Sequence, residues 1–282
     1  MNRPTRNSIL CPNCRKLISS DEKRCPHCGI PSPGSPIKNN PITRHWGSGE
    51  QLVKIIIYTN ITMYLISLLL NLRMTSFGFN PLTMLSPSID SLIALGAAGV
   101  YTIKTSQAWW WTLISANYLH GSLLHIFFNL IGLYQLSPLI TQLYGPYRFF
   151  VIYTFSGVIG FLISVLAGIP LTIGASAALC GLIGSALYFG KSRGGPFGQA
   201  IYRQIGGWAL TIIIIGFLIP IINNWAHIGG MAAGVLGGFL LGYHEKRRET
   251  AVHRRLAGIC VAVTVVSLLW GLFQGFLYWA GR

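Results

Sequence analysis

Long runs of apolar residues recur along most of this chain, and polar segments separate only some of them. A run of about 18 or more apolar residues is long enough to cross the hydrocarbon core of a bilayer as a helix. Seven such runs can be delimited, and we expect a membrane-spanning helix in each. They cover residues 52–72, 113–136, 149–168, 173–190, 205–222, 225–243 and 256–280.

Two of these segments carry small residues at every fourth position. The series are Ala177, Gly181 and Ser185 in the fourth segment, and Ala226, Gly230, Gly234, Gly238 and Gly242 in the sixth. Residues four apart share one face of a helix, so each series forms a smooth ridge. Such ridges let two membrane helices approach closely. We therefore expect the fourth and sixth segments to pack directly against each other.

Four polar side chains in apolar surroundings are the candidate functional groups: Ser176, His227, His125 and Asn129. Polar groups inside a membrane are costly and are usually functional or packed against a partner. Ser176 and His227 each lie two or three residues inside their segments, so they share one depth if both segments enter from the same side. His125 and Asn129 lie on one helix face. They are either a hydrogen-bonded pair between helices or donors directed at an oxyanion beside the serine.

The composition and the charge distribution predict the class of protein and its orientation. Only 10% of the residues are charged, against roughly a quarter in soluble domains. With a cytoplasmic N-terminus, 18 of the 21 Lys and Arg residues fall inside, and only Arg73, Lys104 and Arg282 fall outside. The positive-inside rule therefore predicts a multi-pass cell-membrane protein in this orientation, and it explains the net charge of +15 without a nucleic acid. Ser176 and His227 would then both lie near the outer face.

The acidic residues narrow the chemistry, because none of them falls inside an expected span. They are Asp21, Glu22, Glu50, Asp90, Glu245 and Glu249. This distribution excludes a paired-aspartate protease and the His-Glu-x-x-His metalloprotease pattern, and it removes the acidic member of a Ser-His-Asp triad. It also argues against an ion-coupled transporter. A serine with a histidine remains.

The segment between the first two spans, residues 73–107, is too irregular for a span and too apolar for a free linker. We expect it to lie in the membrane interface. Trp109, Trp110 and Trp111 follow it, and such a cluster is typical of an aromatic belt at the membrane surface.

The N-terminal residues 1–30 predict a separate metal-binding module. Two Cys-x-x-Cys knuckles supply four thiolates for a tetrahedral structural zinc, from Cys11, Cys14, Cys25 and Cys28. On the reducing side of a membrane disulfides are not expected. Residues 31–50 are rich in Pro, Gly and Ser and read as a linker. Whether the module is purely structural or binds a cytoplasmic protein partner stays open.

The membrane region resembles the rhomboid family of intramembrane serine proteases. Three motifs carry the resemblance: His120 with His125-x-x-x-Asn129, Gly174-x-Ser176, and Ala226-His227-x-Gly229-Gly230 with its glycine ridge. It implies an all-α polytopic fold with a six-helix core at 51–245, and a seventh helix within 246–282. It further implies Ser176 as nucleophile, His227 as general base, and an oxyanion hole of His125, Asn129 and the Ser176 amide. Transmembrane proteins would be the substrates, and catalysis would need no cofactor.

Two positions near the serine depart from the family pattern. Ala177 replaces a glycine and adds a methyl group where we expect the fourth and sixth segments to cross. Cys180 replaces an aromatic residue that usually supports the histidine ring. Two alternatives therefore stay open: a catalytically impaired rhomboid-like protein that binds transmembrane segments without cleaving them, and a zinc-ribbon membrane sensor whose spans are a scaffold.

Overall fold

The computed structural model describes residues 8–11, 16–27, 29–30, 32–35, 49–72, 75, 80, 83–105 and 110–281. The chain divides into two compact units, Met1–Leu52 and Val53–Arg282, and each is described by itself.

The first unit contains a small antiparallel hairpin. Strand β1 (Ser8–Leu10) pairs with β2 (Leu17–Ser19) so that Ile9 lies opposite Ile18. Side chains alternate between the two faces of a strand. Ile18 is therefore buried with Cys11 and Cys25, and Ile9 packs against them.

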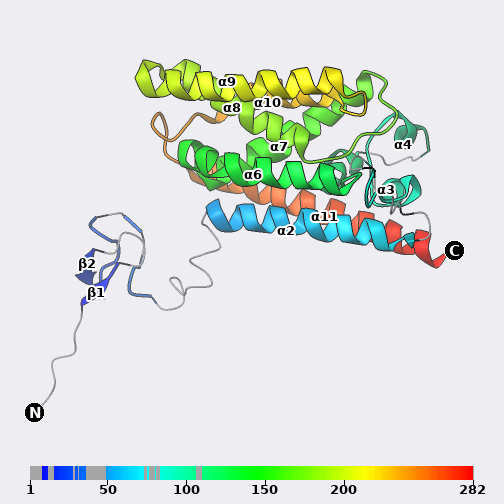
Figure 1. Ribbon diagram of the computed structural model, residues 1–282. Coiled ribbons are helices and arrows are strands. Elements are labelled where there is room, and N and C mark those ends of the chain that lie inside the picture. Colours follow the sequence, from blue (N-terminus) through cyan, green and yellow to red (C-terminus); the bar gives the residue numbers. More distant parts are fainter. Residues whose placement is uncertain are drawn as a thin grey trace, which may run out of the picture. The chain divides into compact units, whose positions relative to one another are not determined.

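The second unit is helical, and Figure 1 shows its long helices α2, α6, α9 and α11 running in roughly the same direction across the view. The long helices are α2 (Gly49–Leu69), α6 (Leu123–Tyr144), α7 (Pro146–Leu166), α8 (Ser176–Arg193), α9 (Gly195–Leu218), α10 (Asn224–Leu241) and α11 (Ala251–Ala280). The short ones are α3 (Ile89–Ala94), α4 (Val100–Thr105), α5 (Thr112–Ser115) and the 3₁₀ helix η2 (Ala116–Tyr118).

Five of the long helices among the described residues are long and apolar enough to cross a membrane: α2, α6, α7, α9 and α11. The chain is thus a multi-pass membrane protein of the all-α class. Helices α8 and α10, each of 18 residues, are not among these five. They are the helices that carry Ser176 and His227.

The expectation of one helix over 113–136 is wrong at both ends. The chain first forms α5 and η2 and is extended at Leu119, and α6 begins only at Leu123. The hydroxyl of Ser122 caps α6 by accepting a hydrogen bond from the backbone N–H of His125, at 3.2 Å. An apolar run conceals such a break, because hydropathy does not register a cap. His125 therefore lies in the first turn of its helix.

The segment before α5 is partly helical and joins the core. Ala98 forms an isolated antiparallel bridge with Thr172, just ahead of α8. Trp111 is only 7% exposed, so it is a packing residue rather than part of an aromatic belt. Trp110 is 56% exposed, and Trp109 lies outside the described residues.

The predicted contact between the two small-residue ridges is confirmed. A Cβ atom added at Gly230 would lie 2.1 Å from the carbonyl oxygen of Ala177, and one at Gly234 would lie 1.8 Å from that of Gly181. No side chain fits into these spaces, so the backbones of α8 and α10 touch. Because both ridges start near the N-termini of their helices, this contact brings those two ends together.

Candidate active site

Ser176 is the first residue of α8, at the end of a tightly held loop. Gly174 has a φ of +116°, which favours glycine, and its N–H donates to the carbonyl of Ala116 in η2 at 2.9 Å. The first N–H groups of a helix have no partner within the helix, and its dipole favours negative charge there. The serine oxygen therefore lies where an oxyanion would be stabilised.

His227 contacts this serine directly. Its Nε2 lies 2.9 Å from Ser176 Oγ, and the residue is 7% exposed. Its other ring nitrogen, Nδ1, is buried and has no hydrogen-bond partner among the residues that the structure describes. No described carboxylate orients the ring, so its position depends on how α10 is held.

Asn223, which is not among the residues predicted from the sequence, holds the start of α10. Its side-chain oxygen accepts a hydrogen bond from the N–H of Ala226 at 3.2 Å and so caps the helix. Its Nδ2 donates to the hydroxyls of Ser164 on α7 and of Thr172 before α8. The residue four positions before His227 thus ties α10 to α7 and to the loop that precedes Ser176. Asparagine at the head of an apolar run is a helix-cap signal that could have indicated this.

His125 lies against the loop that leads to the serine. Its Nδ1 accepts a hydrogen bond from the N–H of Gly121 at 3.3 Å. A neutral imidazole that accepts at one nitrogen carries its proton on the other, so the proton is on Nε2. A Cβ atom at Gly174 would lie 2.5 Å from this Nε2. His125 therefore presents a donor beside Gly174, two residues before Ser176.

Asn129 lies one turn further along α6, on the same face as His125. Its Nδ2 donates to the carbonyl oxygen of His125 at 2.8 Å, which leaves the second hydrogen of that amide available. The Asn129 side chain is buried, and its Oδ1 has no partner within the described part of the chain. His120 is fully buried and packs edge-on against the His125 ring, with centroids 5.0 Å apart.

The methyl group of Ala177 does not keep α10 away from α8. Gly160 on α7 faces it, because a Cβ at Gly160 would lie 3.0 Å from the Ala177 Cβ. The backbone of Ala177 meets Gly230, and the serine and histidine are in contact with the methyl group present. The methyl group that Ala177 adds therefore faces α7, and α8 and α10 still touch at their crossing. Cys180 is buried one turn after the serine.

The N-terminal cysteines are described in part. Cys11 and Cys25 are 1% and 2% exposed and lie in one buried cluster. The N–H of each donates to the carbonyl five residues later, that of Lys16 and that of Ile30 respectively. Within the described ranges no group of three or more potential metal ligands is present. Cys14 and Cys28 lie outside those ranges.

Comparison with known proteins identifies the family of the membrane unit. Residues 107–244 match the family described as the Rhomboid domain, a range that contains all four candidate site residues. The RHOMBOID-like protein 5 of Arabidopsis thaliana is 32% identical over 238 residues, which cover 76% of this chain and 74% of that protein. The chain belongs to the rhomboid family. Members of the family are usually serine intramembrane proteases, which supports this class of function.

Other rhomboid relatives differ in length and in activity. The rhomboid protease GluP of Bacillus subtilis is 32% identical over 193 residues, which cover 66% of this chain but only 36% of GluP. The inactive RHOMBOID-like protein 8 of Arabidopsis thaliana is 34% identical over 160 residues, which cover 55% of this chain and 44% of that protein. Membership of the family alone therefore does not establish cleavage by this rhomboid.

Proposed function

We propose that this rhomboid is an intramembrane serine endopeptidase in which Ser176 is the nucleophile and His227 the general base. The observation that carries the proposal is the 2.9 Å contact between Ser176 Oγ and His227 Nε2, in a chain whose candidate spans make it a membrane protein. A nucleophile and a base within hydrogen-bond reach are the minimal arrangement for acyl transfer.

In the proposed reaction His227 Nε2 takes the hydroxyl proton as Ser176 Oγ attacks the peptide carbonyl, and then gives it to the leaving amine. In the second step His227 takes a proton from a water molecule that attacks the acyl-enzyme, and then returns the proton to Ser176 Oγ. The pair acts as a dyad, since Nδ1 of His227 meets no described carboxylate. The bonds of Asn223 replace the orienting role that an aspartate has in a triad, because they fix the helix on which the ring stands.

The oxyanion that forms on the carbonyl oxygen of the scissile peptide would be held by three donors. These are the Ser176 backbone N–H, His125 Nε2–H and the second hydrogen of Asn129 Nδ2. The tautomer of His125 supports this role, because the hydrogen bond from Gly121 leaves the proton on the nitrogen beside Gly174. Donors of this kind act on charge that develops in the transition state.

Transmembrane helices are the proposed substrates, cut near the outer face of the membrane. The excess of Lys and Arg on the other side supports this orientation and a cytoplasmic N-terminus. The half-buried Ser176 lies at a helix start rather than in mid-helix, which suits a shallow site that water can reach.

The test is labelling by a fluorophosphonate probe together with cleavage of a transmembrane substrate in liposomes. The parent protein should label and cleave, and Ser176→Ala and His227→Ala should each abolish both while remaining folded, because the two residues act as one unit. Near-parental cleavage by either variant would contradict the dyad. An intact, folded parent that neither labels nor cleaves would favour the second candidate, a rhomboid-like protein that binds transmembrane segments; Cys180 and the inactive relative favour it.

For the N-terminal unit we propose a structural zinc held by Cys11, Cys14, Cys25 and Cys28. The burial of Cys11 and Cys25 in one cluster supports it, as does the backbone hydrogen bond that each donates to the carbonyl five residues later. Zinc would supply the folding free energy that so small a core lacks, and no step of the proposed proteolysis involves it.

A further inference from the structure

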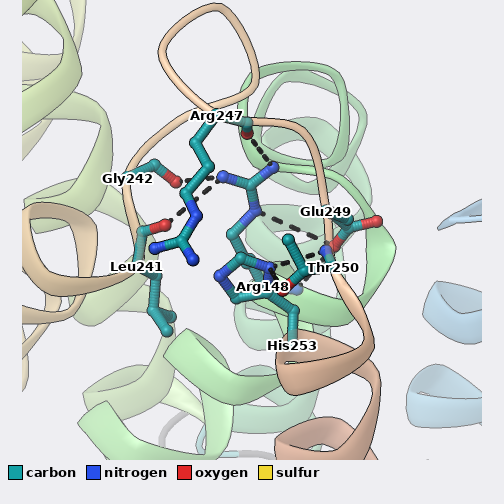
Figure 2. Close-up of polar contacts among 7 residues, drawn as sticks. All are labelled: Arg148, Leu241, Gly242, Arg247, Glu249, Thr250 and His253. Atoms are coloured by element: carbon teal, nitrogen blue, oxygen red, sulfur yellow. Dashed lines mark hydrogen bonds and ion pairs between the residues drawn. The ribbon is translucent and has the colours of Figure 1, made fainter.

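Arg148, near the start of α7, is a fully buried guanidinium that the proposed reaction does not use. Figure 2 shows it surrounded by the loop between α10 and α11. Its Nη1 donates to the carbonyls of Leu241 at 3.4 Å and Gly242 at 2.5 Å, and its Nη2 donates to that of Arg247 at 2.8 Å. Its Nε lies 3.9 Å from the carboxylate of Glu249.

These contacts fix both ends of the loop. The carbonyl groups of Leu241 and Gly242 lie at the C-terminal end of α10. A positive charge at this end complements the helix dipole. Glu249 lies just before α11, and its carboxylate accepts the backbone N–H of Arg148 at 2.9 Å, which caps the start of α7. The Glu249 carboxylate fills the space where a Cβ of Gly145 would stand. The Arg148 side chain, at the start of α7, thus contacts the end of α10 directly and the start of α11 through Glu249.

Helix α11 also contacts the segment that supports the serine. A Cβ at Gly271 would lie 2.7 Å from the carbonyl oxygen of Leu95, so the α11 backbone packs against that residue. The hydroxyl of Ser115 donates to the same carbonyl at 2.6 Å. The next residue, Ala116, accepts the N–H of Gly174, two positions before Ser176.

We propose that Arg148 is a positioning residue for catalysis, acting at about 21 Å from His227 along α10 (14 residues at 1.5 Å). By clamping the loop it holds the histidine helix at its far end, and it holds α11 against the segment that carries Ala116. The seventh helix is then a working part of the catalytic core. This inference rests on the proposed function.

The chain offers a matched control. Arg193 and Glu245 form an ion pair at 2.9 Å, and Glu245 belongs to the same loop, but their side chains are 31% and 56% exposed. Exposed pairs contribute little to stability, whereas a buried charge that loses its partners is costly. Arg193→Met therefore removes a similar interaction without disturbing the clamp.

The experiment compares Arg148→Met, Arg148→Lys and Arg193→Met with the parent in two assays. The first is tryptic cleavage after Arg247, whose carbonyl is bonded to Arg148 in the intact protein. The second is steady-state cleavage of a transmembrane substrate. Arg148→Met should be cut at Arg247 and should lose about 10-fold or more in kcat with KM nearly unchanged, because misplacement of the dyad leaves substrate binding intact. Arg148→Lys, with its charge but no fork of donors, should lie in between, and Arg193→Met should match the parent.

A variant cut at Arg247 but with the parental kcat would overturn the positioning role. Parental values of Arg148→Met in both assays would also overturn it. If Arg148→Met fails to fold, the variant Glu249→Gln tests the proposal instead. It keeps an acceptor for the Arg148 backbone N–H and removes the negative charge. It should be cleaved faster by trypsin and have a lower kcat than the parent. Parental behaviour of Glu249→Gln would again overturn the proposal. A parent protein without Ser176-dependent cleavage would instead overturn the proposed function, and the positioning role with it.

Discussion

The substitution Gly234→Ala tests whether the close contact of the two ridges is what brings His227 to Ser176. Gly234 lies two turns after His227, on the face of α10 that touches α8. A Cβ at this position would lie 1.8 Å from the carbonyl oxygen of Gly181, whereas ordinary contacts begin at 3.4 Å. The obstacle is backbone, which cannot rotate away. The two helices would therefore have to separate by about 1.6 Å, the difference of these two distances.

A displacement of this size exceeds what the site can absorb. The Ser176–His227 contact is 2.9 Å, and a rigid movement of α10 would lengthen it to as much as about 4.5 Å, beyond the range of a hydrogen bond. Misplacement by about 1 Å can cost about 100-fold in rate. We therefore expect Gly234→Ala to lower kcat by about 100-fold and stability by about 1–3 kcal/mol through overpacking.

The matched control is Gly258→Ala on α11, where an added Cβ meets nothing within 4 Å. Alanine is the better helix former, so this variant should gain up to about 1 kcal/mol and keep the parental rate. The assay is substrate cleavage in liposomes, with thermal unfolding and fluorophosphonate labelling measured on the same samples. A Gly234→Ala protein that cleaves and labels at the parental rate would refute the reasoning that backbone contact sets the geometry of the dyad.

Three further predictions concern the cap of α10, the proposed oxyanion hole and the N-terminal unit. Asn223→Ala removes the cap of α10, so it should lower stability by about 1 kcal/mol and lower kcat. The neighbouring substitution Asn224→Ala should not lower kcat. Equal kcat values for the two variants would show that Asn223 does not position His227. His125→Ala and Asn129→Ala should each lower turnover by about 10- to 1,000-fold, with His125→Ala the slower, as expected for the loss of one oxyanion donor; unchanged turnover in both would return the pair to a packing role. A fragment ending near Ile30 should bind one zinc per chain under reducing conditions, and a metal analysis that finds no zinc would disprove this. Removal of residues 1–30 should leave proteolysis intact.

The sequence could predict the helical class and the contact that places the site, because both depend on local pattern. Apolar runs locate the long helices, and small residues at every fourth position show which faces touch. Ser176 and His227 could be paired at one depth because each lies in the first turn of its helix, beside the start of its ridge. Their roles in catalysis stay predictions.

What the sequence could not predict depends on contacts between distant residues. Glu249 meets Arg148 from 101 positions away, and no periodic pattern connects a loop carboxylate to a helix start. The methyl group of Ala177 lies where α8 and α10 were expected to cross, but it faces a glycine of a third helix, Gly160. The break before α6 was not predicted because a serine cap inside an apolar run changes the direction of the chain without changing its hydropathy.

The composition of α8 and α10 has a consequence for how this protein is made. Helices α8 and α10 are not among the described helices that are long and apolar enough to cross a membrane. Helix α8 ends in Lys191 and Arg193, and α10 carries glycines on the face that touches α8. Transfer into lipid favours long apolar side chains, so neither helix is driven strongly into the bilayer during synthesis. We therefore expect each to depend on contacts with neighbouring helices for its place in the bundle. The residues that let α8 and α10 touch therefore also make the two helices depend on each other, and we expect variants on the ridges to be degraded more readily during biogenesis as well as to lose rate.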